Sequence, residues 1–191
     1  MKKRPRIIIR PITAIFAGLL ILLDGSMLAL LPLLAALCHE LGHLAVMLAL
    51  GVPVREIELT LFGAEIRTPP LTTRTAGTVA VYAAGAAANL LSAAVIFLIP
   101  NRSFEAEFFA VCSISLAALN LLPIRSLDGG CILEAVVTRL APPHMSAILD
   151  VVSFVSLFLL WLTAVYLLLI CGGNLSLMLF CMYLFVTVFL G

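Results

Sequence analysis

Charged residues are scarce in this chain: they make up 11% of its 191 residues, against about a quarter in an ordinary soluble domain. Hydrophobic residues make up 63%, and a water-soluble domain of this size could not bury that much apolar surface. The five cysteines include no Cys-x-x-Cys pair, which argues against a secreted scaffold held together by disulfides. These absences exclude the soluble and disulfide-rich classes and favour a membrane protein.

Long apolar runs fill most of the sequence, and a helix needs about 20 mainly apolar residues to cross a bilayer core of about 30 Å. Segments rich in glycine, proline and asparagine separate the runs. We therefore expect an all-α polytopic membrane protein that forms a single domain over residues 1–191. The six expected spans are about residues 12–23, 27–50, 75–99, 107–122, 146–170 and 175–190. The first run is short, and we expect it to extend back toward Ile7.

The distribution of basic residues predicts the orientation of these spans. If the basic N-terminus is cytoplasmic, six spans place the connections 51–74 and 123–145 on the same side. Ten of the eleven basic residues then lie inside, and only Arg102 lies outside. This strong bias predicts that both termini are cytoplasmic.

The segment from Val54 to Arg67 differs from the helical runs around it. Polar and apolar residues alternate along it, and Gly63 interrupts the alternation, which predicts a small interfacial β-hairpin between the second and third spans. A substrate segment could pair with its edge, because strand addition is a common mode of peptide recognition. The alternative is a plain connecting loop.

The sequence His39-Glu40-Leu41-Gly42-His43 lies within the second apolar run. Residues four apart share one face of a helix, so His39 and His43 could bind one zinc ion through their imidazole nitrogens. Glu40 points to a neighbouring face, close enough to act on a water molecule beside the ion. Ionisable groups within a membrane helix cost several kcal/mol unless they are paired, and a zinc ion would compensate all three.

A catalytic zinc site usually takes three protein ligands, so a third must come from elsewhere. The histidines lie seven to eleven residues from the inner end of their expected span, or about 10 to 16 Å. Asp128 is on the same side, in the loop expected after the fourth span, where Gly129-Gly130 would let its carboxylate turn inward. We expect Asp128 to be the third ligand, with Glu134 as the alternative.

Two asparagines in the expected spans have two interpretations each. Asn89 follows the small residues Gly85 to Ala88 in the third span, and Asn120 lies near the end of the fourth. Each could hydrogen-bond a neighbouring helix, which is the commoner role. The functional alternative is that one or both bind substrate by donating hydrogen bonds to its carbonyl oxygen or oxyanion.

These motifs resemble the signature of the site-2 protease family, which pairs His-Glu-x-x-His with a later Asn-x-x-Pro-x-x-x-Leu-Asp-Gly; here the second motif is Asn120 to Gly129. The sequence is most similar to the stage IV sporulation branch, whose members process a membrane-associated sigma-factor precursor. The resemblance implies that His39, His43 and Asp128 bind zinc and that Glu40 is the catalytic acid and base. The family often has Gly-Pro-x-x-Asn in the third span, where this chain has Gly85-Ala86-Ala87-Ala88-Asn89.

We therefore expect an intramembrane zinc metalloprotease of the bacterial cytoplasmic membrane, with its active site toward the cytoplasm. It would cleave a membrane-associated protein, release a regulator such as a sigma factor, and respond to regulatory membrane proteins; we expect no nucleic-acid partner. Two alternatives remain open: a membrane zinc transporter, and a catalytically silent scaffold that binds membrane segments. A transporter would carry several ligand clusters along a path, and a silent scaffold would have lost Glu40 or a ligand.

Overall fold

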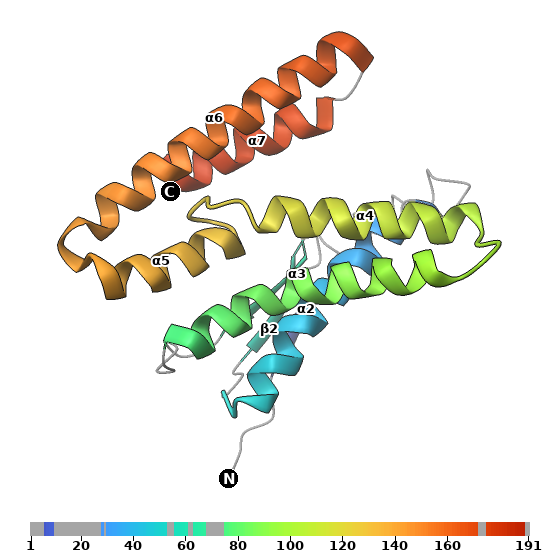
Figure 1. Ribbon diagram of the computed structural model, residues 1–191, viewed down its shortest axis with the longest axis horizontal. Helices are drawn as coiled ribbons and strands as arrows, with labels where there is room; N and C mark the ends of the chain where they lie inside the picture. The colour runs from blue at the N-terminus through green and yellow to red at the C-terminus, as the bar shows by residue number, and fades with distance from the viewer. Residues whose placement is uncertain are drawn as a thin grey trace. The chain divides into compact units, whose positions relative to one another are not determined.

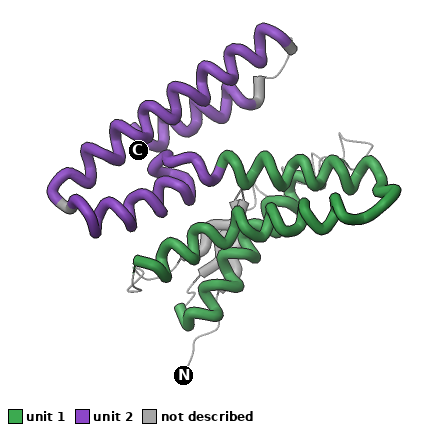
Figure 2. Tube along the Cα trace, in the orientation of Figure 1, with its two compact units in different colours: residues 1–119 green, residues 120–191 purple. Residues whose placement is uncertain are grey.

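The computed structural model describes residues 6–9, 28, 30–52, 56–60, 63–67, 75–171 and 175–189. The chain divides into two compact units, residues 1–119 and 120–191 (Figure 2), and each is described by itself. The elements follow in chain order as β1 (Arg6–Ile9), α2 (Leu30–Ala49), β2 (Glu56–Thr60), β3 (Gly63–Arg67), α3 (Thr75–Leu98), α4 (Phe104–Asn120), α5 (Asp128–Leu140), the 3-10 turn η1 (Pro142–His144), α6 (Met145–Cys171) and α7 (Leu175–Phe189) (Figure 1).

In the first unit, α2 packs along α3. Leucine and alanine, both good helix formers, make up most of the sequence of α2, and the helix ends where Gly51 adopts a left-handed conformation (φ 69°). The amide of Gly51 donates to the carbonyl of Leu48, and the amide of Val52 donates to that of Met47, which is a Schellman motif. Met47, Val52 and Val81 of α3 form a small buried cluster, so the end of α2 is anchored on α3.

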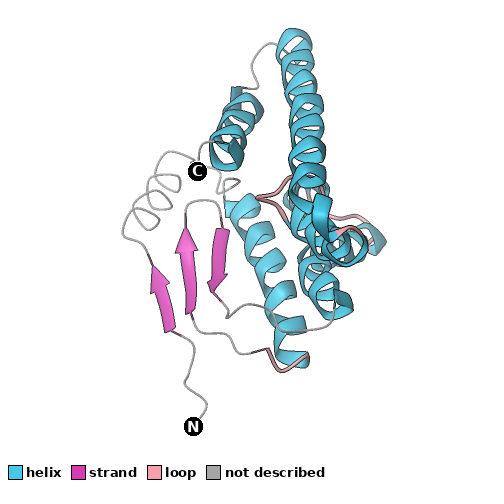
Figure 3. Cartoon of the chain, turned by 90° about the vertical axis from the view of Figure 1, so that its left-hand side faces the viewer, coloured by secondary structure: helices cyan, strands magenta, loops and turns pink. Residues whose placement is uncertain are grey.

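A three-stranded sheet with the strand order β1-β2-β3 belongs to the first unit (Figure 3). β2 and β3 pair antiparallel, with Glu56 opposite Arg67 and Thr60 opposite Gly63, over the segment where a hairpin is expected. β1 pairs parallel to β2, with Arg6 opposite Glu56. The expected extension of the first span back toward Ile7 is therefore wrong, because residues 6–9 form a strand.

In the second unit, α6 and α7 pack together and α5 packs on α6. Ile124, Leu157 and Leu184 form the buried core of this unit, and Ile124 is fully buried. The next residue, Arg125, ties the turn that carries Ile124 to α6. Its backbone amide donates a hydrogen bond to the hydroxyl of Ser153 over 3.0 Å. The Arg125 side chain also pairs with Asp150 at 3.1 Å.

Three of the described helices are long and apolar enough to cross a membrane: Leu30–Ala49, Thr75–Leu98 and Met145–Ile170. They match the second, third and fifth expected spans, and the chain is an integral membrane protein. The expected count of six is not supported, because α4 and α7 have only 17 and 15 residues and the expected span 12–23 lies outside the described residues. The single domain expected over residues 1–191 stays a prediction.

The connection expected between residues 123 and 145 contains a helix that the sequence interpretation missed. Residues Asp128–Leu140 form α5, so Asp128 begins a helix instead of lying in a loop. Gly129-Gly130 had indicated a turn, but the glycines serve close packing: a Cβ at Gly129 would collide with the carbonyl oxygens of Leu121 and Leu122. Only glycine lets the first turn of α5 approach the preceding backbone this closely.

Candidate metal centre

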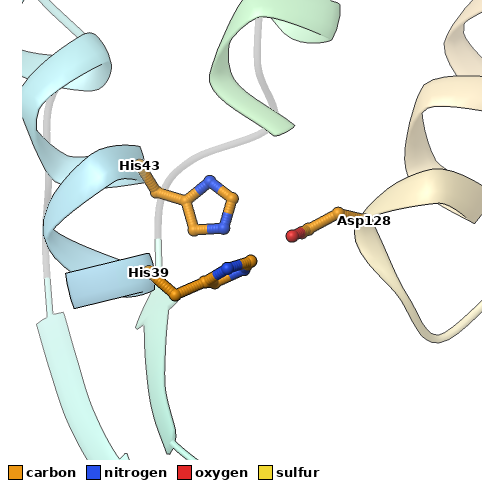
Figure 4. A group of neighbouring side chains, drawn as sticks. All are labelled: His39, His43 and Asp128. Atoms are coloured by element: carbon orange, nitrogen blue, oxygen red, sulfur yellow. The ribbon is translucent and has the colours of Figure 1, made fainter. Parts of the chain in front are cut away.

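His39 and His43 lie one helical turn apart on α2, and both side chains are buried, with exposed fractions of 4% and 7%. Their ring centroids are 4.7 Å apart, and the rings meet edge to face. Figure 4 shows both rings projecting from the same side of α2. The predicted pairing of the two imidazoles on one helix face is therefore present in the structure.

The backbone of α3 fixes one nitrogen of His43. Nδ1 of His43 lies 2.7 Å from the carbonyl oxygen of Val81, and a carbonyl oxygen can only accept a hydrogen bond. The Nδ1 atom must therefore carry the proton, which leaves the lone pair of Nε2 free of a proton and able to bind a metal ion. Hydrogen bonds of this kind commonly orient a histidine ligand and select its tautomer.

Gly85 of α3 makes room for the Nε2 atoms of both histidines. A Cβ built on Gly85 would lie 2.5 Å from Nε2 of His43 and 2.6 Å from Nε2 of His39, and real Cβ atoms do not come so close to another side chain. The two nitrogens thus converge on a space that exists because residue 85 has no side chain. Such a cradle, lined by two buried imidazoles, fits a metal ion.

Asp128 belongs to the second unit, where it is half-buried as the first residue of α5. Figure 4 draws its carboxylate at the start of that helix. Among the described residues, His39, His43 and Asp128 make up one group that could hold a metal ion. Two imidazoles and a carboxylate are the three protein ligands of a typical catalytic zinc site. Glu134, the alternative third ligand, is exposed and is not in this group.

The remaining predicted site residues lie in different settings. Glu40 is half-buried on α2 next to His39, and Asn120 is half-buried as the last residue of α4. Asn89 is fully buried on α3, and its amide nitrogen lies 3.4 Å from Nδ1 of His39. The structure therefore brings Asn89 together with a predicted metal ligand, whereas the expected substrate contacts of Asn89 and Asn120 stay predictions.

Sequence reasoning missed the two other parts of α3 that face the histidines. Val81 acts through its backbone, which leaves no side-chain signature, and Gly85 stands out in the sequence only as one of the small residues before Asn89. A signal was available in the spacing: Val81, Gly85 and Asn89 are four residues apart, so they follow one face of a helix. That face lies against the face of α2 that carries His39 and His43.

Comparisons with known proteins found a matching family model and a curated relative. Residues 101–163, which include Asp128, match the model of a family described as Peptidase family M50. A Synechocystis sp. protein with the name "Putative zinc metalloprotease" is 32% identical to this chain over 139 residues, which are 65% of this chain and 35% of that protein. This chain thus spans 35% of the length of that curated relative.

One solved structure shows the same fold. The structure of the site-2 protease from Methanocaldococcus jannaschii resembles this chain with a TM-score of 0.63 and 21% sequence identity. The match covers 96% of this chain and 90% of the archaeal one.

Proposed function

We propose that this chain, a member of the site-2 protease family, is a zinc-dependent peptidase that hydrolyses a peptide bond within or next to a membrane-embedded segment of its substrate. One observation carries the proposal: two buried imidazoles converge beside a glycine on α3, and they do so on a helix apolar and long enough to cross a membrane. Polar groups at such a position are expensive and indicate function. A bound metal ion would compensate the two imidazoles.

In this proposal His39 and His43 would hold the zinc ion through Nε2, and Asp128 would supply the third donor. The bound ion would provide Lewis-acid chemistry, which lowers the pKa of a water molecule and polarises the scissile carbonyl. The carboxylate of Glu40 takes a proton from the attacking water and later delivers it to the amine that leaves. Proton transfer of this kind typically contributes a factor of about 10² to 10⁴ to the rate.

The edge strands of the three-stranded sheet, β1 and β3, are candidates for holding the substrate. A helical substrate hides its carbonyl groups in its own hydrogen bonds, so it must unwind locally before it can be cut. An extended segment could pair with an edge strand such as β3, which is in contact with α2, the helix that carries His39 and His43. Pairing would hold the segment in the extended form that hydrolysis requires.

The proposed substrate is a membrane-associated protein, and the resemblance to the sporulation proteases favours a regulator such as a sigma-factor precursor. We also propose six membrane spans, with both termini and the entrance to the site on the cytoplasmic side of a bacterial cell, because that arrangement places ten of the eleven basic residues inside. Regulatory membrane proteins would control access of the substrate.

A zinc transporter is the competing function, and it requires several ligand clusters along a path. Within the described part of the chain, His39, His43 and Asp128 make up the one group found, which favours a single fixed site. A catalytically silent scaffold would keep the packing of α2 on α3 but would lack the catalytic glutamate at position 40. This chain has Glu40.

Co-expression with candidate membrane-tethered transcription factors tests the activity. The wild type is compared with Glu40→Gln, which keeps the size of the side chain but removes its ability to take up a proton at neutral pH. We expect processing of one candidate by the wild type and loss of processing with Glu40→Gln, while both purified proteins contain equal amounts of zinc. Processing that survives the substitution would refute the role of Glu40.

A further inference from the structure

In each histidine, Nδ1 lies next to a polar group of α3, at Val81 or Asn89, and Nε2 lies next to the space at Gly85 of the same helix. For His43, the group that Nδ1 meets is the carbonyl oxygen of Val81, at 2.7 Å. For His39, it is the side-chain amide of Asn89, at 3.4 Å. The two Nδ1 atoms therefore have different partners, one from the backbone and one from a side chain.

The amide of Asn89 can face His39 in two ways, which are related by a half turn of its terminal group. With the amide nitrogen toward the ring, its N–H donates to Nδ1, and the proton of a neutral His39 is then on Nε2. With Oδ1 toward the ring, Nδ1–H donates to Oδ1, and the lone pair of Nε2 is available. Only the second arrangement leaves His39 able to bind a metal ion through the nitrogen that faces Gly85.

A second observation points the same way. Asn89 is fully buried, and its Oδ1 atom has no hydrogen-bond partner among the described residues while the nitrogen faces the ring. A buried acceptor without a partner is unfavourable, because it has lost its hydrogen bonds to water. The half turn that makes Nε2 available gives this oxygen a donor and turns the amide nitrogen to the position that the oxygen leaves.

We propose that Asn89 is a positioning residue for the metal site: its Oδ1 accepts a hydrogen bond from Nδ1–H of His39 and thereby holds that ring in the tautomer that binds through Nε2. This inference rests on the metal site of the proposed function. Val81 performs the same task for His43 with its carbonyl oxygen, so one face of α3 selects the tautomer of both ligands. Asn89 acts through His39 and need not touch the substrate.

The alternative is that Asn89 stabilises only the packing of α2 on α3, which is the commoner role of an asparagine in a membrane helix. In that case the chemical nature of the group that faces Nδ1 would not matter to the metal. Substitutions of Asn89 that remove the hydrogen-bond acceptor, compared with one that keeps it, therefore decide between the two roles.

The experiment measures metal affinity of the full chain in detergent, by titration with Co²⁺ followed through its visible absorption and by competition with Zn²⁺. Four variants are compared with the wild type: Asn89→Asp, which keeps an acceptor, Asn89→Leu and Asn89→Ala, which remove it, and Ser113→Ala as a matched control. Ser113 is another fully buried polar residue, on α4, whose hydroxyl has no partner among the described residues. Thermal unfolding of the metal-free proteins reports packing separately, and Asn89→Ala serves if Asn89→Leu does not fold.

We expect Asn89→Leu and Asn89→Ala to bind Co²⁺ about 10- to 100-fold more weakly than the wild type, the usual loss when the partner of a histidine ligand is removed. Asn89→Asp should bind at least as tightly as the wild type, and Ser113→Ala should bind equally. The inference is overturned if the variants that lack an acceptor bind as tightly as the wild type, or if Asn89→Asp is as weak as they are. A wild-type chain that binds no Co²⁺ would instead contradict the proposed metal site itself.

Discussion

At the scale of single residues, the site depends as much on what is missing from α3 as on the histidines of α2. Gly85 contributes no side chain, and that space is where Nε2 of His39 and Nε2 of His43 converge. The carbonyl of Val81 and the amide of Asn89 then engage the opposite nitrogens of the two rings. Metal binding therefore depends on the close packing of α2 on α3, and a small change on α3 should affect it.

Gly85→Ala is the direct test of this dependence. The added methyl group would lie about 2.5 Å from both Nε2 atoms, so the rings must move, at a cost of about 1 to 3 kcal/mol for an overpacked site. If the metal-bound state bears this cost, metal affinity falls roughly 5- to 150-fold, as measured by Co²⁺ titration. Ala87→Val, which enlarges an exposed position on the same helix, should leave the affinity unchanged. Equal affinities of Gly85→Ala and the wild type would show that this space is not the metal site.

At the scale of secondary-structure elements, the start of α5 controls where Asp128 is held. Gly129 packs against the carbonyl oxygens of Leu121 and Leu122. The segment between α4 and α5 is anchored by Ile124, a fully buried residue. A carboxylate in the first turn of a helix is also stabilised by the helix dipole. The position of the proposed third ligand is thus set by backbone packing within the second unit.

Gly129→Ala should disturb that position without changing any ligand. Because the new methyl group collides with backbone atoms that cannot yield easily, we expect about 1 to 3 kcal/mol of destabilisation and a weaker hold on the metal. Thermal unfolding and metal titration measure the two effects. Ser126→Ala, at an exposed position two residues before Asp128, is the control and should change neither. Full metal affinity in a destabilised Gly129→Ala protein would argue that Asp128 is not a ligand.

Periodicity and motif spacing predicted the elements that depend on local sequence. The apolar runs indicated α2, α3 and α6, and the four-residue spacing of His39 and His43 predicted their common face. The same reasoning missed α5, because Gly129-Gly130 and Pro142-Pro143 have the residue types of turns and the close packing that requires the glycines is a tertiary feature. It also placed Ile7 in a helix, because a run as short as the three isoleucines Ile7 to Ile9 is compatible with a strand or a helix until its pairing partner is known.

At the scale of the whole molecule, the distribution of charge predicts how the chain sits in the membrane. Only Arg102 among the basic residues is assigned to the outside, and it pairs with Glu107 at 2.9 Å. Arg139, in the last turn of α5, is assigned to the cytoplasmic side. The regions around Arg102 and Arg139 should therefore be accessible from opposite sides of the membrane.

Labelling with a membrane-impermeant thiol reagent checks this orientation in intact cells. A cysteine at Ser103→Cys should be modified from outside, whereas a cysteine at Arg139→Cys should react only after the cells are opened; both positions are exposed. The wild type supplies the background from the native cysteines. The reverse pattern would invert the proposed orientation and move the entrance of the site to the outside.

The zinc content of the purified chain tests the central claim most directly. We predict about one zinc ion for each wild-type chain, as expected of a site with three protein ligands. The Glu40→Gln protein should contain the same amount, whereas His39→Ala, His43→Ala and Asp128→Ala should lose the metal while remaining folded. Folded wild-type protein that contains no zinc after purification without chelators, or ligand variants that retain it in full, would contradict the account.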